Sequence, residues 1–246
     1  KEKRKMDKFI LYSLIAAEEA IKNSGLVIND DNQASRSGVI VGSGIGGLST
    51  IYENSILLEK SGPRKISPFF IPSSLINLSS GQISIKYNFK GPNHSTVTAC
   101  ASGAHAIGDS FRLIQLDKAD VMVAGGTEAA ICRLGIAGFC SLRALSTKFN
   151  DDPKNASRPF DKDRDGFVMG DGAGILILEE YEHAKKRNAN IMAEIIGYGS
   201  SGDAHHITSP PEDGNGAERC VLSALNDAKK NSEDINYINA HGTSTP

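Results

Sequence analysis

The chain has 246 residues, of which 39% are hydrophobic and 23% charged, with a formal net charge of -2. Such a composition is typical of a globular protein with one or two sizeable cores. It gives no general attraction to nucleic acid, and the sequence contains neither an apolar run of membrane-spanning length nor a secretory signal. The four cysteines form no C-x-x-C pair and no metal-ligand spacing with histidine, so we expect free thiols in a reducing, cytoplasmic setting.

Hydrophobic periodicity predicts alternating helices and short strands. Gly25 should end the first helix, and Ser73 or Ser74 should cap a helix that runs to about residue 83. A strand–helix–strand order within residues 96–126 predicts a right-handed β-α-β crossover. The other predicted helices are 7–24, 104–114, 179–188 and 217–230, and the predicted strands are 39–41, 96–98, 120–126, 174–178, 191–199 and 235–240.

Cys100 lies between a predicted strand and a predicted helix, in a run of small residues. At the start of a helix, unpaired N–H groups and the positive end of the macrodipole favour a thiolate. Small neighbours would let a substrate carbonyl approach both the sulfur and the backbone. Cys132, Cys140 and Cys220 are not expected to share this strand–turn–helix context, so Cys100 is the candidate nucleophile, with a buried and inert thiol as the alternative.

Three other stretches imitate ligand-binding motifs. Residues 42–47 match the G-x-G-x-x-G dinucleotide fingerprint, but Glu59 lies near the end of a helical stretch rather than at a strand terminus. Residues 161–166 imitate half of a calcium loop, but position 12 would be Gly172 instead of glutamate. His205 and His206 are adjacent, which is a poor arrangement for one metal ion. We therefore expect a close-packed glycine turn, a turn held by Asp–Arg pairing, and a loop.

Several motifs together resemble the β-ketoacyl-acyl carrier protein synthases, in particular the elongating enzymes of bacterial fatty acid synthesis. The motifs occur in family order over nearly the whole chain, which is more specific than any one of them. The matching stretches are residues 42–48, 62–70, 98–103, 123–126, 157–161, 164–167, 170–174, 208–211 and 240–246.

The resemblance implies an α/β, thiolase-like five-layer αβαβα sandwich built from two similar halves. It places residues 1–180 in the N-terminal half, without its first strand, and 181–246 at the beginning of the C-terminal half. The implied reaction is a decarboxylative Claisen condensation of malonyl-carrier with acyl-carrier. The implied partners are the acyl carrier protein, acyl and malonyl thioesters, and a second copy of the chain in a homodimer. No metal and no cofactor are implied, because phosphopantetheine arrives on the carrier.

The family's pattern also assigns roles to individual residues. Cys100 would carry the acyl thioester, and His241 would hydrogen-bond the malonyl thioester oxygen as the enolate forms. The implied substrate-binding residues are Ile45, Phe70, Thr208, Ser209, Thr243 and Thr245, and the implied carrier-docking residues are Lys1, Arg4, Lys5, Arg64, Lys65 and Arg143.

The family's second active-site histidine, its active-site lysine and its C-terminal glycine-rich loop have no counterpart in these residues. We therefore expect this chain to be a segment that is inactive by itself, with an unpaired sheet edge where the first strand is missing. A polyketide ketosynthase, a non-catalytic chain-length factor of the same fold, and a thiolase are the alternatives. Cys100 and His241 argue against a chain-length factor, and His241-Gly242-Thr243 argues against a thiolase.

Overall fold

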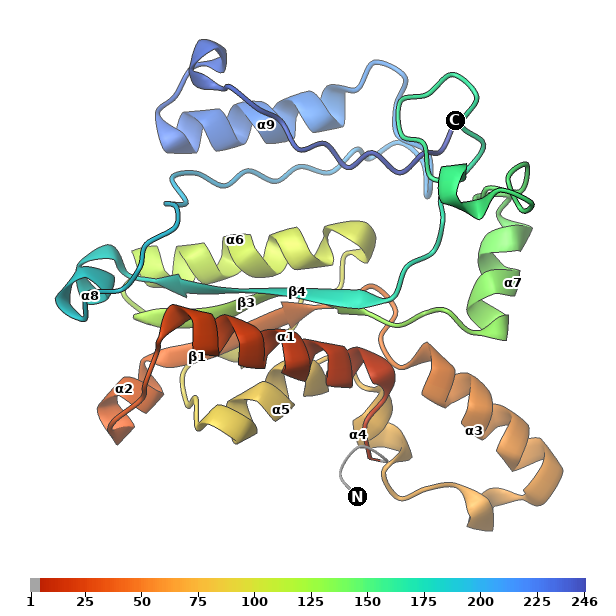
Figure 1. The fold of residues 1–246 in the computed structure, drawn as a ribbon, viewed down its shortest axis with the longest axis horizontal. Helices are drawn as coiled ribbons and strands as arrows, with labels where there is room; N and C mark the ends of the chain where they lie inside the picture. The colour runs from red at the N-terminus through yellow and green to blue at the C-terminus, as the bar shows by residue number, and fades with distance from the viewer. Residues whose placement is uncertain (1–4) are drawn as a thin grey trace. The chain divides into compact units, whose positions relative to one another are not determined.

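A computed structural model describes residues 5–246 (Figure 1). The chain forms two compact units: one extends to Ala189 and also includes Gly242–Pro246, and the other is Asn190–His241. Within the described part of the chain, none of the helices combines the length and apolar character that a bilayer crossing requires.

The first unit is built on a four-stranded sheet with the order β2-β1-β3-β4. β1 (Ser37–Gly42) pairs in parallel with both β2 (Asn93–His94) and β3 (Val121–Glu128), whereas β4 (Gly172–Glu179) is antiparallel to β3. β2 and β3 are both parallel to β1, and the helix formed by residues 102–115 lies between them in the chain, which confirms a crossover connection with its first strand at Asn93–His94. Its right-handedness stays a prediction. Parallel strands place their carboxyl ends together, so the chain after β1, β2 and β3 gathers at one end of the sheet.

Helices cover both faces of this sheet (Figure 1). α1 (Lys8–Ser24) and α5 (Leu78–Tyr87) pack on one face, and α6 (Ser102–Gln115) packs on the other. Alternate residues of β1 supply the two cores, because Val39 and Val41 join the α1–α5 cluster while Ile40 joins the α6 cluster. The described unit therefore has three α/β/α layers.

Shorter elements connect this framework. Asp7 caps α1, and its second oxygen accepts hydrogen bonds from the backbone and hydroxyl of Thr50, which ties α1 to α3. The remaining helices of this unit are α2 (Asp31–Ser35), α3 (Leu48–Ser61), α4 (Phe70–Ser74), α7 (Arg133–Ser141) and α8 (Tyr181–Lys186), with 3-10 turns at Pro63–Lys65, Ala99–Ala101 and Pro153–Asn155.

Two sequence predictions for this unit are wrong in detail. The strand before Cys100 is Asn93–His94, and Thr98 donates its N–H to the Ser102 hydroxyl rather than to a ladder partner. Ser73 and Ser74 end α4 instead of capping α5, because Leu75 turns to an extended conformation. Their hydroxyls donate to carbonyls three residues back, a bond that competes with capping.

The second unit is organised around α9 (Asn215–Ala228), with a 3-10 turn at Ser232–Asp234. The strands predicted at 191–199 and 235–240 are wrong, because neither segment belongs to a sheet in the described residues. The backbone around residue 198 instead bonds to α9: Tyr198 donates its N–H to Asp227, and Cys220 donates its thiol to the Gly199 carbonyl. These bonds explain why an extended segment does not require a neighbouring strand.

The Glu179 carboxylate at the end of β4 and its partner Arg187 connect β4, the end of α8 and the end of α1. The Glu179 side chain is 8% exposed and accepts bonds of 2.7 and 2.6 Å from Nε and Nη2 of Arg187, with His183 Nδ1 at 2.6 Å. Arg187 Nη1 also donates to the Ser24 carbonyl at the end of α1. Burial raises the pKa of Glu179, but the hydrogen bonds from Arg187 and His183 outweigh it, and the pKa lies below its usual 4.5.

We expect Arg187→Leu to lower the free energy of unfolding by about 2 kcal/mol, because it leaves a buried carboxylate without its bidentate partner. The figure is below that for a fully buried pair, since the Arg187 side chain is 24% exposed. The stability from a depressed carboxyl pKa is present above the unfolded pKa and is lost as pH falls through the folded pKa. Urea unfolding should therefore show the difference at neutral pH, and the difference should shrink below about pH 4.

Lys185→Leu on the same helix is the control, because the Lys185–Glu182 pair is exposed and should contribute little. Equal destabilisation by both substitutions would contradict a special role for the Arg187–Glu179 pair.

Candidate functional site

Cys100 is exposed in the 3-10 turn between β2 and α6, so the structure confirms its predicted place at a helix start. The Ser102 hydroxyl holds this turn closed, since it accepts from the Thr98 N–H at 2.9 Å and donates to the Ala99 carbonyl at 2.7 Å. Ala99 has a φ of 50°, a left-handed conformation that costs energy for a residue with a Cβ. The thiol therefore projects from a tight, internally bonded turn at the carboxyl end of the sheet.

Glycines let the sheet press against this turn. A Cβ on Gly42, at the end of β1, would lie 2.4 Å from the carbonyl oxygen of Ser102, and one on Gly126 would lie 3.0 Å from the Cα of Gly103. Neither distance is compatible with a side chain unless the backbone moves. The ends of β1 and β3 therefore pack directly against the start of α6 and fix the position of Cys100.

The other cysteines differ from Cys100, although the expected contrast is wrong for one of them. Cys132 follows β3 and is the N-cap of α7, so it too has a strand–turn–helix context. Its sulfur accepts a hydrogen bond from the Gly135 N–H at 3.4 Å. The Cys220 thiol is bonded to a carbonyl, and Cys140 is exposed within α7. Context alone does not single out Cys100.

The glycine loop after β1 binds a carboxylate of the protein itself. The N–H groups of Gly44, Ile45 and Gly46 donate to Glu128 over 2.8–3.0 Å, and the Ser43 hydroxyl donates to it at 3.0 Å. Consecutive N–H groups of this kind form an anion-binding nest. Because Glu128 occupies this nest, the N–H groups of Gly44, Ile45 and Gly46 are already bonded within the protein.

Sequence reasoning missed Glu128. The available signal was an acidic residue at the end of the buried strand 121–128, but nothing in the sequence connects it with a loop more than 80 residues earlier. The predicted close packing of the loop is confirmed, since a Cβ on Gly47 would lie 2.4 Å from the Cα of Ser74. Ile45 is 37% exposed in this loop, and Phe70 is half-buried at the start of α4.

The last five residues are bonded to the turn at 158–166. Ser244 is 3% exposed; its hydroxyl accepts from the Arg158 N–H, and its carbonyl accepts from the Gly166 N–H, each at 3.0 Å. Arg164 Nε donates to the Thr245 carbonyl at 2.8 Å. The hydroxyls of Thr243 and Thr245 lie 2.7 Å apart, so these two predicted substrate-binding residues are brought together.

Residues 161–166, which imitate half of a calcium loop, have a structural role. Asp165 accepts bonds from the Ser146 hydroxyl and the N–H groups of Lys148 and Thr147, which lower its pKa to about 2. Its oxygens are already used. Arg158 and Asp161 approach only to 3.9 Å, so backbone hydrogen bonds hold the turn more than the predicted Asp–Arg pair. Among the described residues no group of three metal-ligating side chains is found.

The second unit contains three further predicted site residues. Its last residue, His241, is exposed. Thr208 and Ser209 lie in an exposed loop, where both donate their N–H groups to His206 Nδ1 at 3.2 Å. His206 thus accepts hydrogen bonds within its loop, which confirms the predicted loop position of the pair. The meeting of His241 with Cys100 stays a prediction.

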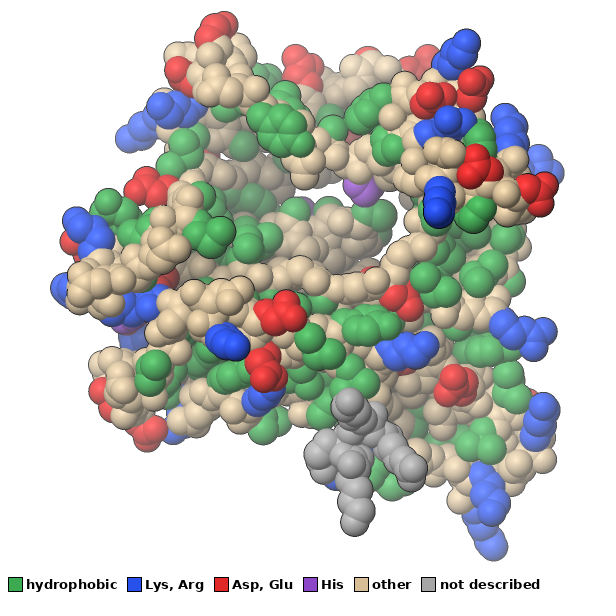
Figure 2. All heavy atoms as spheres, in the orientation of Figure 1, with side chains coloured by type: hydrophobic (Ala, Val, Ile, Leu, Met, Phe, Trp, Pro, Cys, Tyr) green, Lys and Arg blue, Asp and Glu red, His purple; other side chains and the backbone are tan. Residues whose placement is uncertain are grey.

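The predicted docking cations are partly brought together. Lys1 and Arg4 lie outside the described residues. Arg64 and Lys65 are exposed on the turn after α3, and the Lys5 ammonium lies 4.9 Å from the ring centroid of Phe69 just beyond it. Lys60, in the last turn of α3, adds a charge that the prediction missed, and basic side chains gather over this end of α3 in Figure 2. Arg143 is exposed after α7.

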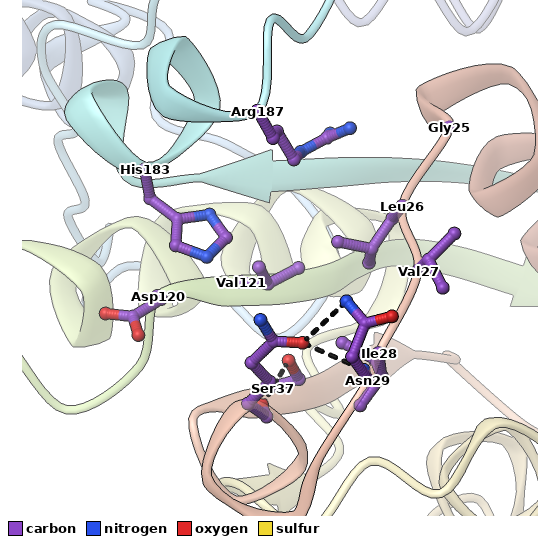
Figure 3. A pocket seen from close by; sticks show the side chains of 11 residues that line it. Gly25, Leu26, Val27, Ile28, Asn29, Ser37, Asp120, Val121, His183 and Arg187 are labelled. Carbon is purple, nitrogen blue, oxygen red and sulfur yellow. Dashed lines mark hydrogen bonds between the residues drawn. The ribbon is translucent and has the colours of Figure 1, made fainter.

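A cavity of about 200 Å³ lies at the opposite end of the sheet, beside the first residues of β1 and β3 (Figure 3). Its charged lining residues are paired within the protein: Asp120 with Arg36, and both His183 and Arg187 with Glu179. No cysteine lines it, and it lies away from the Cys100 turn, so we assign it to the framework. The candidate site is the turn that carries Cys100, the glycine loop and the carboxyl ends of β1 and β3.

Comparisons with known proteins agree with this geometry. Residues 1–184 match the family model for the N-terminal domain of beta-ketoacyl synthases, and residues 192–246 match the model for the C-terminal domain. The 3-oxoacyl-[acyl-carrier-protein] synthase 2 of Rhizobium meliloti is 60% identical over 245 residues, which are 100% of this chain and 58% of the relative. The mitochondrial 3-oxoacyl-[acyl-carrier-protein] synthase of Arabidopsis thaliana is 55% identical over 97% of this chain and 52% of its own length.

Solved structures give the same result for the fold. A beta-ketoacyl synthase from Burkholderia phymatum has a TM-score of 0.90 and 38% identity, covering 99% of this chain and 59% of the other. A type II polyketide ketosynthase, solved with its acyl carrier protein, has a TM-score of 0.90 and 36% identity, covering 97% of this chain and 59% of the other. The chain spans little more than half the length of these relatives. Its α/β architecture is thiolase-like, and the chain belongs to the beta-ketoacyl synthase family.

Proposed function

We propose that this chain carries the nucleophile half of a 3-oxoacyl-[acyl-carrier-protein] synthase, which elongates fatty acids by decarboxylative condensation. The observation that carries the proposal is the exposed Cys100 thiol at the start of α6, in a turn held by the two hydrogen bonds of the Ser102 hydroxyl. The curated relatives in this family have this activity. A thiol in such a position can be acylated and can later act as a leaving group.

In the first step, the Cys100 thiolate attacks the thioester carbonyl of acyl-carrier. A new C–S bond forms at Cys100, the thioester C–S bond to phosphopantetheine breaks, and the carrier leaves as its thiolate, which takes up a proton from water. The tetrahedral intermediate has a negative oxygen, which needs N–H donors already in place. Because the Ser102 bonds and the glycine contacts fix the turn, the N–H of Cys100 is held in place for this role.

In the second step, malonyl-carrier loses CO₂, and the electron pair of the broken C–C bond forms an enolate. Its carbon attacks the acyl-Cys100 carbonyl, which forms the new C–C bond and releases the Cys100 thiolate with a 3-oxoacyl-carrier. His241 is proposed to donate a hydrogen bond to the enolate oxygen. Thr208, Ser209, Thr243 and Thr245 are proposed to position the pantetheine arm. The paired Thr243 and Thr245 hydroxyls offer adjacent polar groups for such an arm.

Ile45 and Phe70 are proposed to line the pocket for the acyl chain. Support comes from the position of the glycine loop, since a Cβ on Gly44 would lie 3.4 Å from the Cα of Ala99, the residue before the nucleophile. The side chain that follows Gly44 therefore emerges next to the acylated turn. The proposed enzyme has no metal or cofactor of its own, acts as a homodimer and works in the cytoplasm.

A polyketide ketosynthase is the second candidate, because one of the similar structures is a type II polyketide ketosynthase with its acyl carrier protein. Sequence identity favours fatty acid elongation: the curated 3-oxoacyl synthases are 52–60% identical, against 36% for the polyketide ketosynthase.

The test is to purify the full-length protein that carries these residues and to supply acyl-carrier with malonyl-carrier. We expect a 3-oxoacyl-carrier two carbons longer than the acyl substrate, with one CO₂ released per product, measured by mass spectrometry and radiolabelled malonate. Repeated condensation on one chain without reduction would support the polyketide alternative. Absence of any condensation product would refute the proposed function.

The basic residues near the end of α3 give a separate prediction for carrier recognition. Reversing Arg64 and Lys65 to glutamate should lower kcat/KM for carrier-bound acyl groups by about 10-fold, because a cationic surface steers an acidic partner. Acyl-pantetheine thioesters lack the carrier, so their kcat/KM should not change. The salt dependence of the carrier reaction should also become flatter.

The matched control reverses Lys118 and Lys162, two exposed lysines in other loops of the first unit. A similar loss with these residues, or an equal loss on the free pantetheine thioester, would show that net charge or folding is responsible instead of docking at α3.

A further inference from the structure

Glu128 makes contacts that none of the proposed chemical steps uses. It is partly buried at the end of β3, and its carboxylate accepts four hydrogen bonds from one short loop. Oε1 accepts from the Ser43 hydroxyl and the Gly46 N–H at 3.0 Å each, while Oε2 accepts from Gly44 and Ile45 at 2.8 and 2.9 Å. Both oxygens are therefore needed to fix the loop.

Packing on both sides of Ile45, and a bond of 3.2 Å from the Gly46 N–H to the Ser43 hydroxyl, also position the loop. Behind it, Gly46 and Gly47 fit against Ile76 and Ser74 so closely that a Cβ would lie 2.5 and 2.4 Å from them. In front, Gly44 lies against the turn of the nucleophile, with its ideal Cβ 3.4 Å from both the Cα and the carbonyl oxygen of Ala99. Ile45 is held between these contacts by its N–H bond to Glu128, while its side chain stays 37% exposed.

From this geometry we infer that Glu128 is a positioning residue for chain-length selection: it fixes the Ser43–Gly46 loop and so sets how far Ile45 closes the acyl pocket beside Cys100. This inference rests on the proposed function, since it requires an acyl chain on Cys100.

A neutral amide at position 128 keeps the length of the side chain but replaces one acceptor oxygen with an NH₂ group. That group cannot accept hydrogen bonds from the loop, so the loop would lose about half of its hydrogen bonds to residue 128 and would open.

The first measurement is independent of activity. Backbone hydrogen exchange in the full-length protein should show Gly44, Ile45 and Gly46 protected in the unaltered protein. In Glu128→Gln their protection should fall about 100-fold, while Val39–Val41 in β1 should keep theirs. Glu128→Asp retains two oxygens on a shorter arm and should recover part of the protection. Glu59→Gln, an acid-to-amide change on exposed α3, is the matched control and should change nothing.

The second measurement is the acyl-chain profile. In Glu128→Gln we expect the ratio of kcat/KM for long to short acyl-carriers to rise about 10-fold, because a released Ile45 no longer limits depth. Ile45→Phe should move the ratio in the opposite direction by enlarging the side chain. A change of kcat/KM that depends on acyl length would indicate altered selectivity, whereas general damage would lower kcat/KM equally for every length.

Unchanged amide protection in Glu128→Gln would contradict the claim that Glu128 fixes the Ser43–Gly46 loop. Lost protection with an unchanged chain-length ratio would overturn the role in selection, while leaving the condensing activity established by the short substrate. Failure of the unaltered protein to form any 3-oxoacyl product would remove the proposed function and this inference with it, and the exchange data would still report separately whether Glu128 holds the loop.

Discussion

Cys100→Ala should abolish acylation of the full-length protein and lower condensation by about 10⁶-fold, the scale of loss when a covalent nucleophile is removed. The physical reason is that, of the four cysteines in the described residues, Cys100 alone is exposed in a turn fixed at the end of the sheet. Intact-mass measurement after incubation with acyl-carrier, followed by peptide mapping, should find one acyl group per chain on Cys100.

Cys132→Ala is the most informative control, because Cys132 also lies at a helix start after a strand. Its sulfur caps α7 through the Gly135 N–H, so the substitution should reduce stability slightly and leave acylation intact. An acyl group that persists in Cys100→Ala, or that maps to Cys132, would show that the nucleophile has been assigned to the wrong turn.

Gly42→Ala should be the most damaging glycine substitution near the site that does not touch the nucleophile. The new methyl would lie 2.4 Å from the Ser102 carbonyl oxygen and 2.6 Å from the Thr96 hydroxyl, so the start of α6 must move away from β1. We expect a loss of about 3 kcal/mol in the free energy of unfolding, at the upper end for overpacking. A shift of the turn by a fraction of an ångström should also reduce kcat about 100-fold.

Gly81→Ala is the matched control, since a Cβ there meets only the Leu78 side chain at an ordinary 3.7 Å. In the middle of α5 it should raise stability by about 0.5–1 kcal/mol and leave kcat unchanged. Chemical unfolding and single-turnover acylation would measure both effects. A stable and fully active Gly42→Ala protein would mean that the contact between β1 and the Cys100 turn is not needed to position the thiol.

Local signals predicted much of the framework. The Asp7 cap and the Gly25 stop delimit α1 within one residue of the expectation, and a buried apolar run gave β3. The β-branched residues at 96–98 gave a wrong strand, because the Thr98 N–H bonds to the Ser102 hydroxyl, which the strand pattern does not include. The segment at 191–199 has the composition of a strand, but α9 bonds to two of its backbone groups, the Tyr198 N–H and the Gly199 carbonyl.

The parts of the site that are built from residues adjacent in sequence could be predicted. The parts that depend on residues far apart in sequence could not. The position of Cys100 before a helix followed from a few adjacent residues, and its chemistry followed from the family resemblance. The Glu128 anchor joins positions 82–85 residues apart, and the cap formed by Cys132 requires knowing where α7 begins. Only the folded chain brings such groups together.

The bonds between Ser244 and the turn at 158–166 also bear on the order in which the chain becomes ordered during synthesis. Arg158 and Ser244 are 86 positions apart. At about 5–20 residues per second, the ribosome adds the intervening chain in about 4–17 s. Until Ser244 is made, the N–H groups of Arg158 and Gly166 lack the partner that they have in the folded unit. The bonds that join the threonine-bearing end of this unit to the turn at 158–166 therefore form well after the residues of the Cys100 turn have been made.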